Sequence, residues 1–163
     1  MNEKVDGASE PRAIATVDEL RTVTTLSDIT FYAIVAIQRE APIDAPTTHE
    51  HHMAVKHEES WLEIRARTTV QAEDATFQVD ASVRFSLAEP ITIPEPVTRA
   101  FIEKVAFPVL YPYIRESVHQ NAVKIGTDVP LLSLLSPTGV DLRPTGDQAE
   151  ESAEDSADDP AEA

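Results

Sequence analysis

The chain has 163 residues, of which 42% are hydrophobic, so it is large enough for one domain with a sizeable core. It contains no Cys, which excludes disulfides, thiolate nucleophiles and Cys-ligated metals. Its 29 acidic residues against 13 basic ones give a formal net charge of −16, a field that would repel nucleic acid and anionic membrane surfaces.

The N-terminal segment is polar. Residues 1–22 have no apolar stretch of the kind found in a secretory signal, and we expect them to be flexible. The longest apolar run before the helical region, Phe31 to Ile37, has seven residues, whereas a membrane span needs roughly 20. We therefore expect a soluble cytoplasmic protein that does not insert into membranes, with its folded domain at residues 23–140.

Four segments are predicted to be β-strands. Residues 75–87 alternate strictly between apolar and polar side chains over thirteen positions, the pattern of a strand with one buried and one solvated face. Residues 61–70 alternate in the same way, and the short link between the two segments predicts an antiparallel hairpin. Residues 29–37 are apolar on both sides and would be covered twice or lie in an interface, whereas residues 48–58 give a weaker, edge-like pattern.

A helical region follows the strands. A Pro-rich connector leads to a helix that begins near Glu95 with Pro96 in its first turn. Pro108 interrupts this helix, and Pro112 bends the first turn of the helical stretch that continues beyond it. Gly126 is a natural helix stop. The predicted fold is α+β: an antiparallel four-stranded meander followed by a Pro-interrupted helix that packs on it.

The C-terminal segment differs in composition from the rest of the chain. Residues 141–163 carry nine acids and one base, and Leu142 is their one large apolar residue. Such a segment cannot bury enough apolar surface to offset the entropy lost on ordering, so we predict a disordered acidic tail. The tail would either serve solubility alone or dock on a basic partner surface.

One histidine cluster suggests a metal. His49, Glu50, His51 and His52 are consecutive, His57 is close by, and His49 and His51 would share one face of a strand. The set has no recognised ligand spacing, so a solvated polar strand is the favoured interpretation. We predict neither a metal nor another cofactor.

Motifs of catalysis are missing from the sequence. It has no GxSxG, no Gly-rich phosphate loop and no HExxH, and it contains only four Gly. Asp80 or Glu63 together with His119 would form an acid/base pair, but surface charges explain these residues better. The sequence therefore does not predict an enzyme.

Surplus apolar and aromatic surface is the feature that does point to a function. Residues 105–114 read VAFPVLYPYI, and PLLSLL follows at 130–135; these residues would cap the sheet or line a partly exposed apolar groove. Tyr32 and Trp61 lie on the more polar sides of their strands, where they would form an oligomer interface or simply stand half exposed.

This apolar region resembles the SecB family of export chaperones. Residues 110–116, Leu-Tyr-Pro-Tyr-Ile-Arg-Glu, resemble the family's Leu-Phe-Pro-Tyr/Phe-Ala-Arg-Glu at the start of its long helix. Residues 129–134, Val-Pro-Leu-Leu-Ser-Leu, are similar to the family's Phe-Pro-x-Leu-x-Leu, and the order of strands, Pro-bearing helix and acidic tail agrees over roughly residues 25–140.

The departures from the family pattern lie near the C-terminus. Residues 124–128 replace the family's Gly-Gly or Arg-Gly, and no apolar periodicity follows Leu142, so the family's final helix, which borders the client groove, is absent or stunted. The YPYIRE form is closer to divergent SecB-like proteins, some of which serve toxin–antitoxin systems.

The resemblance implies a homotetramer that holds unfolded polypeptides, preproteins among them, along apolar grooves without ATP and hands them to the SecA motor. The residues it marks as lining or supporting the groove are Phe107, Leu110, Tyr111, Leu131 and Leu134. Two alternatives stay open. One is a chaperone dedicated to a toxin–antitoxin pair, with an antitoxin as its partner; the other, of a different class, is a small-ligand-binding or isomerase-like α+β domain.

Overall fold

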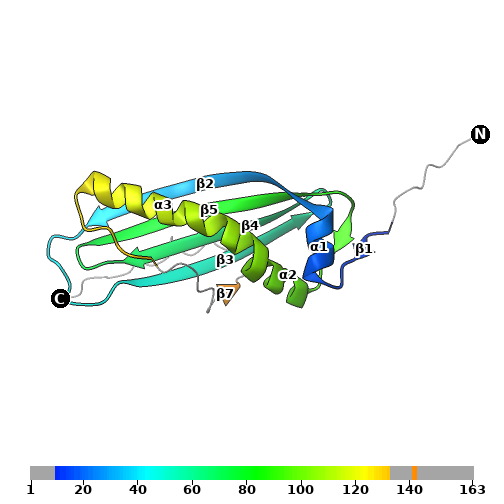
Figure 1. Cartoon of the computed structure of the whole chain (residues 1–163), viewed down its shortest axis with the longest axis horizontal. Helices are drawn as coiled ribbons and strands as arrows, with labels where there is room; N and C mark the ends of the chain where they lie inside the picture. Colours follow the sequence, from blue (N-terminus) through cyan, green and yellow to red (C-terminus); the bar gives the residue numbers. More distant parts are fainter. Residues whose placement is uncertain (1–9, 133–140, 143–163) are drawn as a thin grey trace, which may run out of the picture.

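A computed structural model of the chain describes residues 10–132 and 141–142. One antiparallel sheet carries a layer of helices on a single face (Figure 1). The elements in chain order are β1 (Arg12–Ala13), α1 (Val17–Val23), β2 (Thr24–Gln38), β3 (Thr48–Glu58), β4 (Trp61–Gln71), β5 (Ala75–Leu87), β6 (Ile91–Thr92), α2 (Glu95–Phe101), the π-helical turn η1 (Ile102–Ala106), α3 (Phe107–Ile125) and β7 (Asp141–Leu142). The predicted α+β class, the four antiparallel strands and the helix that packs on them are confirmed.

The order of the strands in the sheet is β2-β5-β4-β3-β7, which differs in one respect from a simple meander. Strands β3, β4 and β5 follow one another, but β2 pairs with β5 instead of β3, as in a Greek key. The connection after β2 explains the difference, because it runs across the end of the sheet. The backbone N–H groups of Arg39 and Ile43 donate to the carbonyls of Asp74 and Glu73 in the β4–β5 turn.

The helical layer begins at Glu95, as predicted, but Pro108 does not break it. A single π-helical turn, η1, precedes this proline, and in it the N–H of Phe107 donates to the carbonyl of Ile102, five residues earlier. The wider turn carries the helix past a residue that has no N–H to donate. Gly126 ends α3 in the left-handed region, with φ of 72°. Among the described residues, no helix is both long and apolar enough to cross a membrane.

The segment before β2 is ordered from residue 10 on, in contrast to the flexibility expected for residues 1–22. Strand β1 pairs in parallel with β6, and Ile14 and Leu20 are buried in the core. A capping box holds α1: the Thr16 hydroxyl accepts from the N–H of Glu19, and the Glu19 carboxylate accepts from the N–H of Ala15. The polar composition of this segment therefore did not indicate the helix α1.

The core lies between the sheet and the helices. Helix α3 crosses one face of the sheet diagonally, with its first turns over β3 (Figure 1). The alternation predicted for β4 and β5 places one set of side chains under the helices, and the largest side chains of this buried layer include Leu62, Ile64, Phe77, Phe101, Phe107, Leu110 and Ile114. Of the predicted acidic tail, residues 141–142 form β7, parallel to β3, and residues 143–163 lie outside the described part of the chain.

Candidate functional site

The five residues marked as groove residues occupy different environments. Phe107, Leu110 and Tyr111 all lie on α3 and are buried, with exposed fractions of 1%, 0% and 3%. They come together under the helix and hold it on the sheet. Leu131, by contrast, is 95% exposed, and Leu134 lies outside the described residues. Three of the predicted side chains therefore lie in the core beneath α3, whereas Leu131 lies on the surface of the molecule.

His51 belongs to the aromatic cluster under α3, whereas the sequence favoured a solvated polar strand over a metal site for it. Its ring lies 4.9 Å from the ring of Phe107 and 5.9 Å from that of Tyr111, measured between centroids, and both contacts are edge-on. Burial, followed by the charges of His49 and His52, lowers the pKa of His51 to about 4. The imidazole is therefore neutral at pH 7 and acts as an aromatic packing group.

The histidine cluster has the predicted strand geometry. His49 and His51 share one face of β3, with ring centroids 5.3 Å apart. Within residues 10–132 and 141–142, no three His, Asp or Glu side chains come together in a way that would hold a metal ion.

Leu131 borders a pocket of about 600 Å³ at one end of the sheet. The pocket lies where the β2–β3 connection, the β4–β5 turn and the segment after α3 meet, and the N–H of Asp128 donates to the Asp74 carboxylate across it at 3.1 Å. Apolar and acidic groups line it together, namely Pro42, Thr47, Ala72, Glu73, Asp74, Asp128, Val129, Pro130 and Leu131. It offers apolar contact beside three carboxylates.

Strand β2 exposes apolar side chains along the edge of the sheet. In the described part of the chain, six of the nine exposed large apolar residues lie on this one strand: Leu26, Phe31, Tyr32, Ile34, Val35 and Ile37. The register with β5 alternates them between the two faces, with a bulge at Tyr32. An edge strand that is this apolar is typical of an interface.

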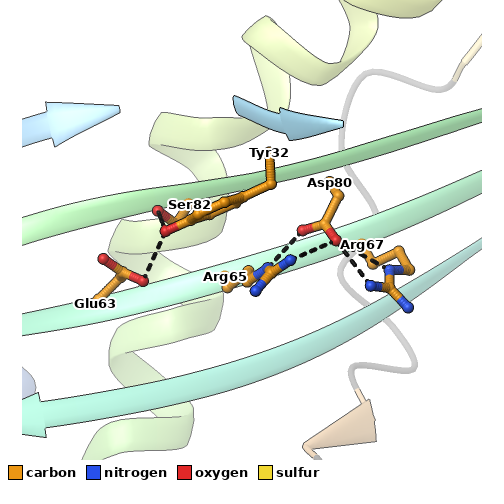
Figure 2. Close-up of polar contacts among 6 residues, drawn as sticks. All are labelled: Tyr32, Glu63, Arg65, Arg67, Asp80 and Ser82. Atoms are coloured by element: carbon orange, nitrogen blue, oxygen red, sulfur yellow. Dashed lines mark hydrogen bonds and ion pairs between the residues drawn. The ribbon is translucent and has the colours of Figure 1, made fainter. Parts of the chain in front are cut away.

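The face of the sheet opposite the helices carries a polar network (Figure 2). At its centre Asp80 is almost fully buried, because two guanidinium groups cover its carboxylate. Arg65 donates to both carboxylate oxygens at 2.6 and 2.8 Å, and Arg67 donates to one of them at 2.9 and 3.1 Å. Burial alone would raise the pKa of the Asp80 carboxyl, but the hydrogen bonds from both arginines outweigh it and lower the pKa.

Both residues predicted at an oligomer interface lie on this open face. The Arg65 guanidinium stacks 4.1 Å above the Tyr32 ring, and the Tyr32 hydroxyl bonds to the Glu63 carboxylate (Figure 2). Trp61 lies near two cations, Lys56 at 5.0 Å and Arg84 at 4.6 Å. The open face is thus an organised cationic and aromatic surface.

The sequence interpretation treated Asp80 and Glu63 as ordinary surface charges, and the network was missed. Its signal was present in the alternation, because the polar positions of β4 and β5 carry opposite charges that face one another. Arg67 is paired with Asp80 in the register, and Glu63 is paired with Arg84. Cross-strand pairs of this kind are the unit of stabilisation on a sheet.

Comparison with known proteins identifies the class. No protein-family model matches the sequence. The SecB-like chaperone SmegB of Mycolicibacterium smegmatis is 32% identical over 135 residues, which cover 83% of this chain and 91% of the relative. The chain belongs to the family of SecB-like chaperones, and the resemblance drawn from residues 110–116 and 129–134 is confirmed.

A solved structure agrees in fold. The Mycobacterium tuberculosis SecB-like chaperone Rv1957, in complex with a ChAD peptide from the Rv1956 HigA1 antitoxin, matches with a TM-score of 0.62 and 21% identity over 73% of this chain and 92% of that one. These relatives are chaperones and indicate no catalytic activity, so the isomerase-like alternative gains no support.

Proposed function

We propose that this chaperone is a holdase, which binds unfolded polypeptide without ATP and releases it without chemistry. Membership of the SecB-like family carries the proposal. The combination of exposed apolar side chains with a net charge of −16 supports it, because charge keeps the holder soluble while apolar surface binds the client. A cytoplasmic location is part of the proposal.

The preferred client, we infer, is an antitoxin. The solved structural relative is itself bound to an antitoxin peptide, which supports this choice. Delivery of preproteins to SecA is the second candidate, favoured by the Leu-Tyr-Pro-Tyr-Ile-Arg-Glu segment at residues 110–116 that resembles export chaperones.

Client contact is assigned to the exposed apolar surface near the end of α3. Leu131, with its adjoining pocket, contacts the client directly. Leu134, three residues later in the sequence, is proposed as a further client contact. Phe107, Leu110 and Tyr111 fix the position of α3 from beneath. The carboxylates around the pocket favour clients that carry a basic residue beside an apolar one.

The proposed assembly is a homotetramer. The apolar edge of β2 supplies the first interface, because two copies that meet there would cover the unpaired backbone groups and the exposed side chains at once. Tyr32 belongs to that edge, and Trp61 is proposed to flank it on the open face.

Aggregation of reduced, unfolded lysozyme, followed by light scattering without nucleotide, tests the holdase. We expect suppression that saturates at about a fourfold excess of chains, as a tetramer with one client requires. Leu131→Asp should weaken suppression, whereas Val123→Asp, at an exposed apolar position on α3, should not. No suppression by the native chain at large excess would contradict a general holdase.

A second arm of the test uses a synthetic copy of the ChAD peptide from the HigA1 antitoxin that is bound in the structural relative. Binding of the peptide without suppression of lysozyme aggregation would support a chaperone with a dedicated client. Ile37→Lys on β2 should shift the sedimentation coefficient toward smaller species, and an unchanged assembly would contradict the β2 interface.

A further inference from the structure

Asp74 joins three segments that meet at one end of the sheet. It lies in the turn between β4 and β5, and its backbone carbonyl accepts a hydrogen bond at 2.7 Å from the N–H of Arg39, in the β2–β3 connection. Its carboxylate accepts a second hydrogen bond at 3.1 Å from the N–H of Asp128, in the residues that follow α3. Both segments that border the pocket are therefore fixed to the same turn, by different parts of one residue.

The β2–β3 connection does not depend on the Asp74 side chain. The N–H of Ile43 donates to the backbone carbonyl of Glu73 at 2.9 Å, and the Arg39 guanidinium donates to the Thr76 hydroxyl at 2.9 Å. These bonds would remain if the Asp74 carboxylate were removed. Loss of the carboxylate therefore releases one wall of the pocket and leaves the other wall in place.

The segment after α3, residues 127–132, carries Leu131 close to two points of attachment. Asp128, near the start of the segment, is held by its hydrogen bond to Asp74, and Leu132, at its end, is buried in the core with an exposed fraction of 6%. Leu131 is the residue before Leu132, yet it is 95% exposed. A surface that is ordered before a client arrives binds more tightly than a mobile one, because less entropy is lost on binding.

We propose that Asp74 is a positioning residue of the client site: its carboxylate tethers the segment after α3 and so holds Leu131 in place for the client. The proposal rests on the proposed holdase function, in which Leu131 contacts the client. The tether requires an acceptor oxygen, so it is distinct from the attraction that the pocket's carboxylates exert on basic clients. Because the bond lies at the surface, its loss should weaken client binding by only about three- to tenfold.

Two substitutions at Asp74 separate the hydrogen bond from the charge. Asp74→Ala removes both, whereas Asp74→Asn removes the charge and keeps an acceptor oxygen. Glu73→Gln is the matched control, because it removes a neighbouring charge of the pocket while the backbone carbonyl of residue 73 still accepts from Ile43. All variants are made in the full chain.

Hydrogen exchange of the Asp128 amide, followed by NMR without client, measures the tether itself. We expect this amide to exchange severalfold faster in Asp74→Ala and at close to the native rate in Asp74→Asn and Glu73→Gln. The amides of β5 should keep their native rates in every variant, which reports that the sheet is intact. A native rate for Asp128 in Asp74→Ala would overturn the proposal.

Suppression of the aggregation of reduced lysozyme measures the consequence for the client. Asp74→Ala should require about three- to tenfold more chain than the native protein for half suppression, and Asp74→Asn should behave like Glu73→Gln. Equal weakening in Asp74→Ala and Asp74→Asn would assign the effect to charge and overturn the proposal, as would unchanged suppression in Asp74→Ala. If the native chain does not suppress aggregation, the holdase and the client role of Asp74 fail together, whereas the exchange of the Asp128 amide still decides whether Asp74 tethers the segment.

Discussion

The packing of His51 predicts how the stability of the fold depends on pH. The pKa of this imidazole is lowered from 6.5 to about 4, first by burial and then by its histidine neighbours. In the unfolded chain the ring regains its ordinary pKa near 6.5. Between these two values the unfolded chain binds more protons at this site than the folded chain does. The free energy of unfolding therefore falls as the pH is lowered from about 6.5 toward 4, and the contribution of neutral His51 is complete only above that window.

The magnitude follows from the size of the shift. A change of this extent corresponds to about 3 kcal/mol if it acts in full. Because the ring is half-buried, solvent screening reduces the effect to on the order of 1–2 kcal/mol. His57 contributes in the same direction, because burial lowers its pKa as well. A comparison of variants is needed to isolate His51.

Urea unfolding, followed by the fluorescence of Trp61 at about pH 7 and pH 5, measures this effect. The native chain should lose roughly 1 kcal/mol more than His51→Gln over this interval, because glutamine does not titrate. His119→Gln, on the exposed side of α3, should behave like the native chain. If His51→Gln keeps the full pH dependence, the ring is not a neutral packing group and the reasoning fails.

Three further substitutions test the packing and the open face. Phe107→Ala should lower the free energy of unfolding by about 3–5 kcal/mol in urea titrations, because the side chain is fully buried; a loss below 1 kcal/mol would contradict its place in the core. Asp80→Asn should cost roughly 2–4 kcal/mol at pH 7, since it removes the charge that two arginines share, and the cost should shrink as the pH falls through the lowered pKa of Asp80; a cost independent of pH would argue against the ion pairs. Gly126→Ala should cost about 1 kcal/mol in thermal unfolding through its positive φ alone, because nothing lies within 4 Å of an added Cβ.

The strands of this fold could be predicted because their information is local. The strict alternation at residues 75–87 and 61–70 places β5 and β4 and separates their buried and open sides. The order of the sheet could not be predicted in the same way. Nine residues connect β2 to β3, and their composition does not indicate which strand β2 pairs with. That choice is made by long-range pairing with β5.

The candidate site was predictable in part. The motif at residues 110–116 identified the family, but burial of Phe107 and Tyr111 depends on how α3 lies over β3. Burial of Asp80 likewise results from two arginines on a neighbouring strand, so the sequence around Asp80 does not predict it. The capping box of α1 was a readable signal, since Thr16 and Glu19 stand at the required spacing within a polar segment.

The two prolines of the helical layer mark the place where the helix has the fewest backbone hydrogen bonds to resist bending. Pro108 and Pro112 stand one turn apart and neither donates a backbone hydrogen bond, and the π-helical turn lies directly before them. A change of angle at this joint therefore disrupts fewer backbone hydrogen bonds than it would in a regular helix. Helices α2 and α3 are therefore joined where the backbone has the fewest hydrogen bonds to lose, between Phe101 and Phe107, which are both buried against the sheet.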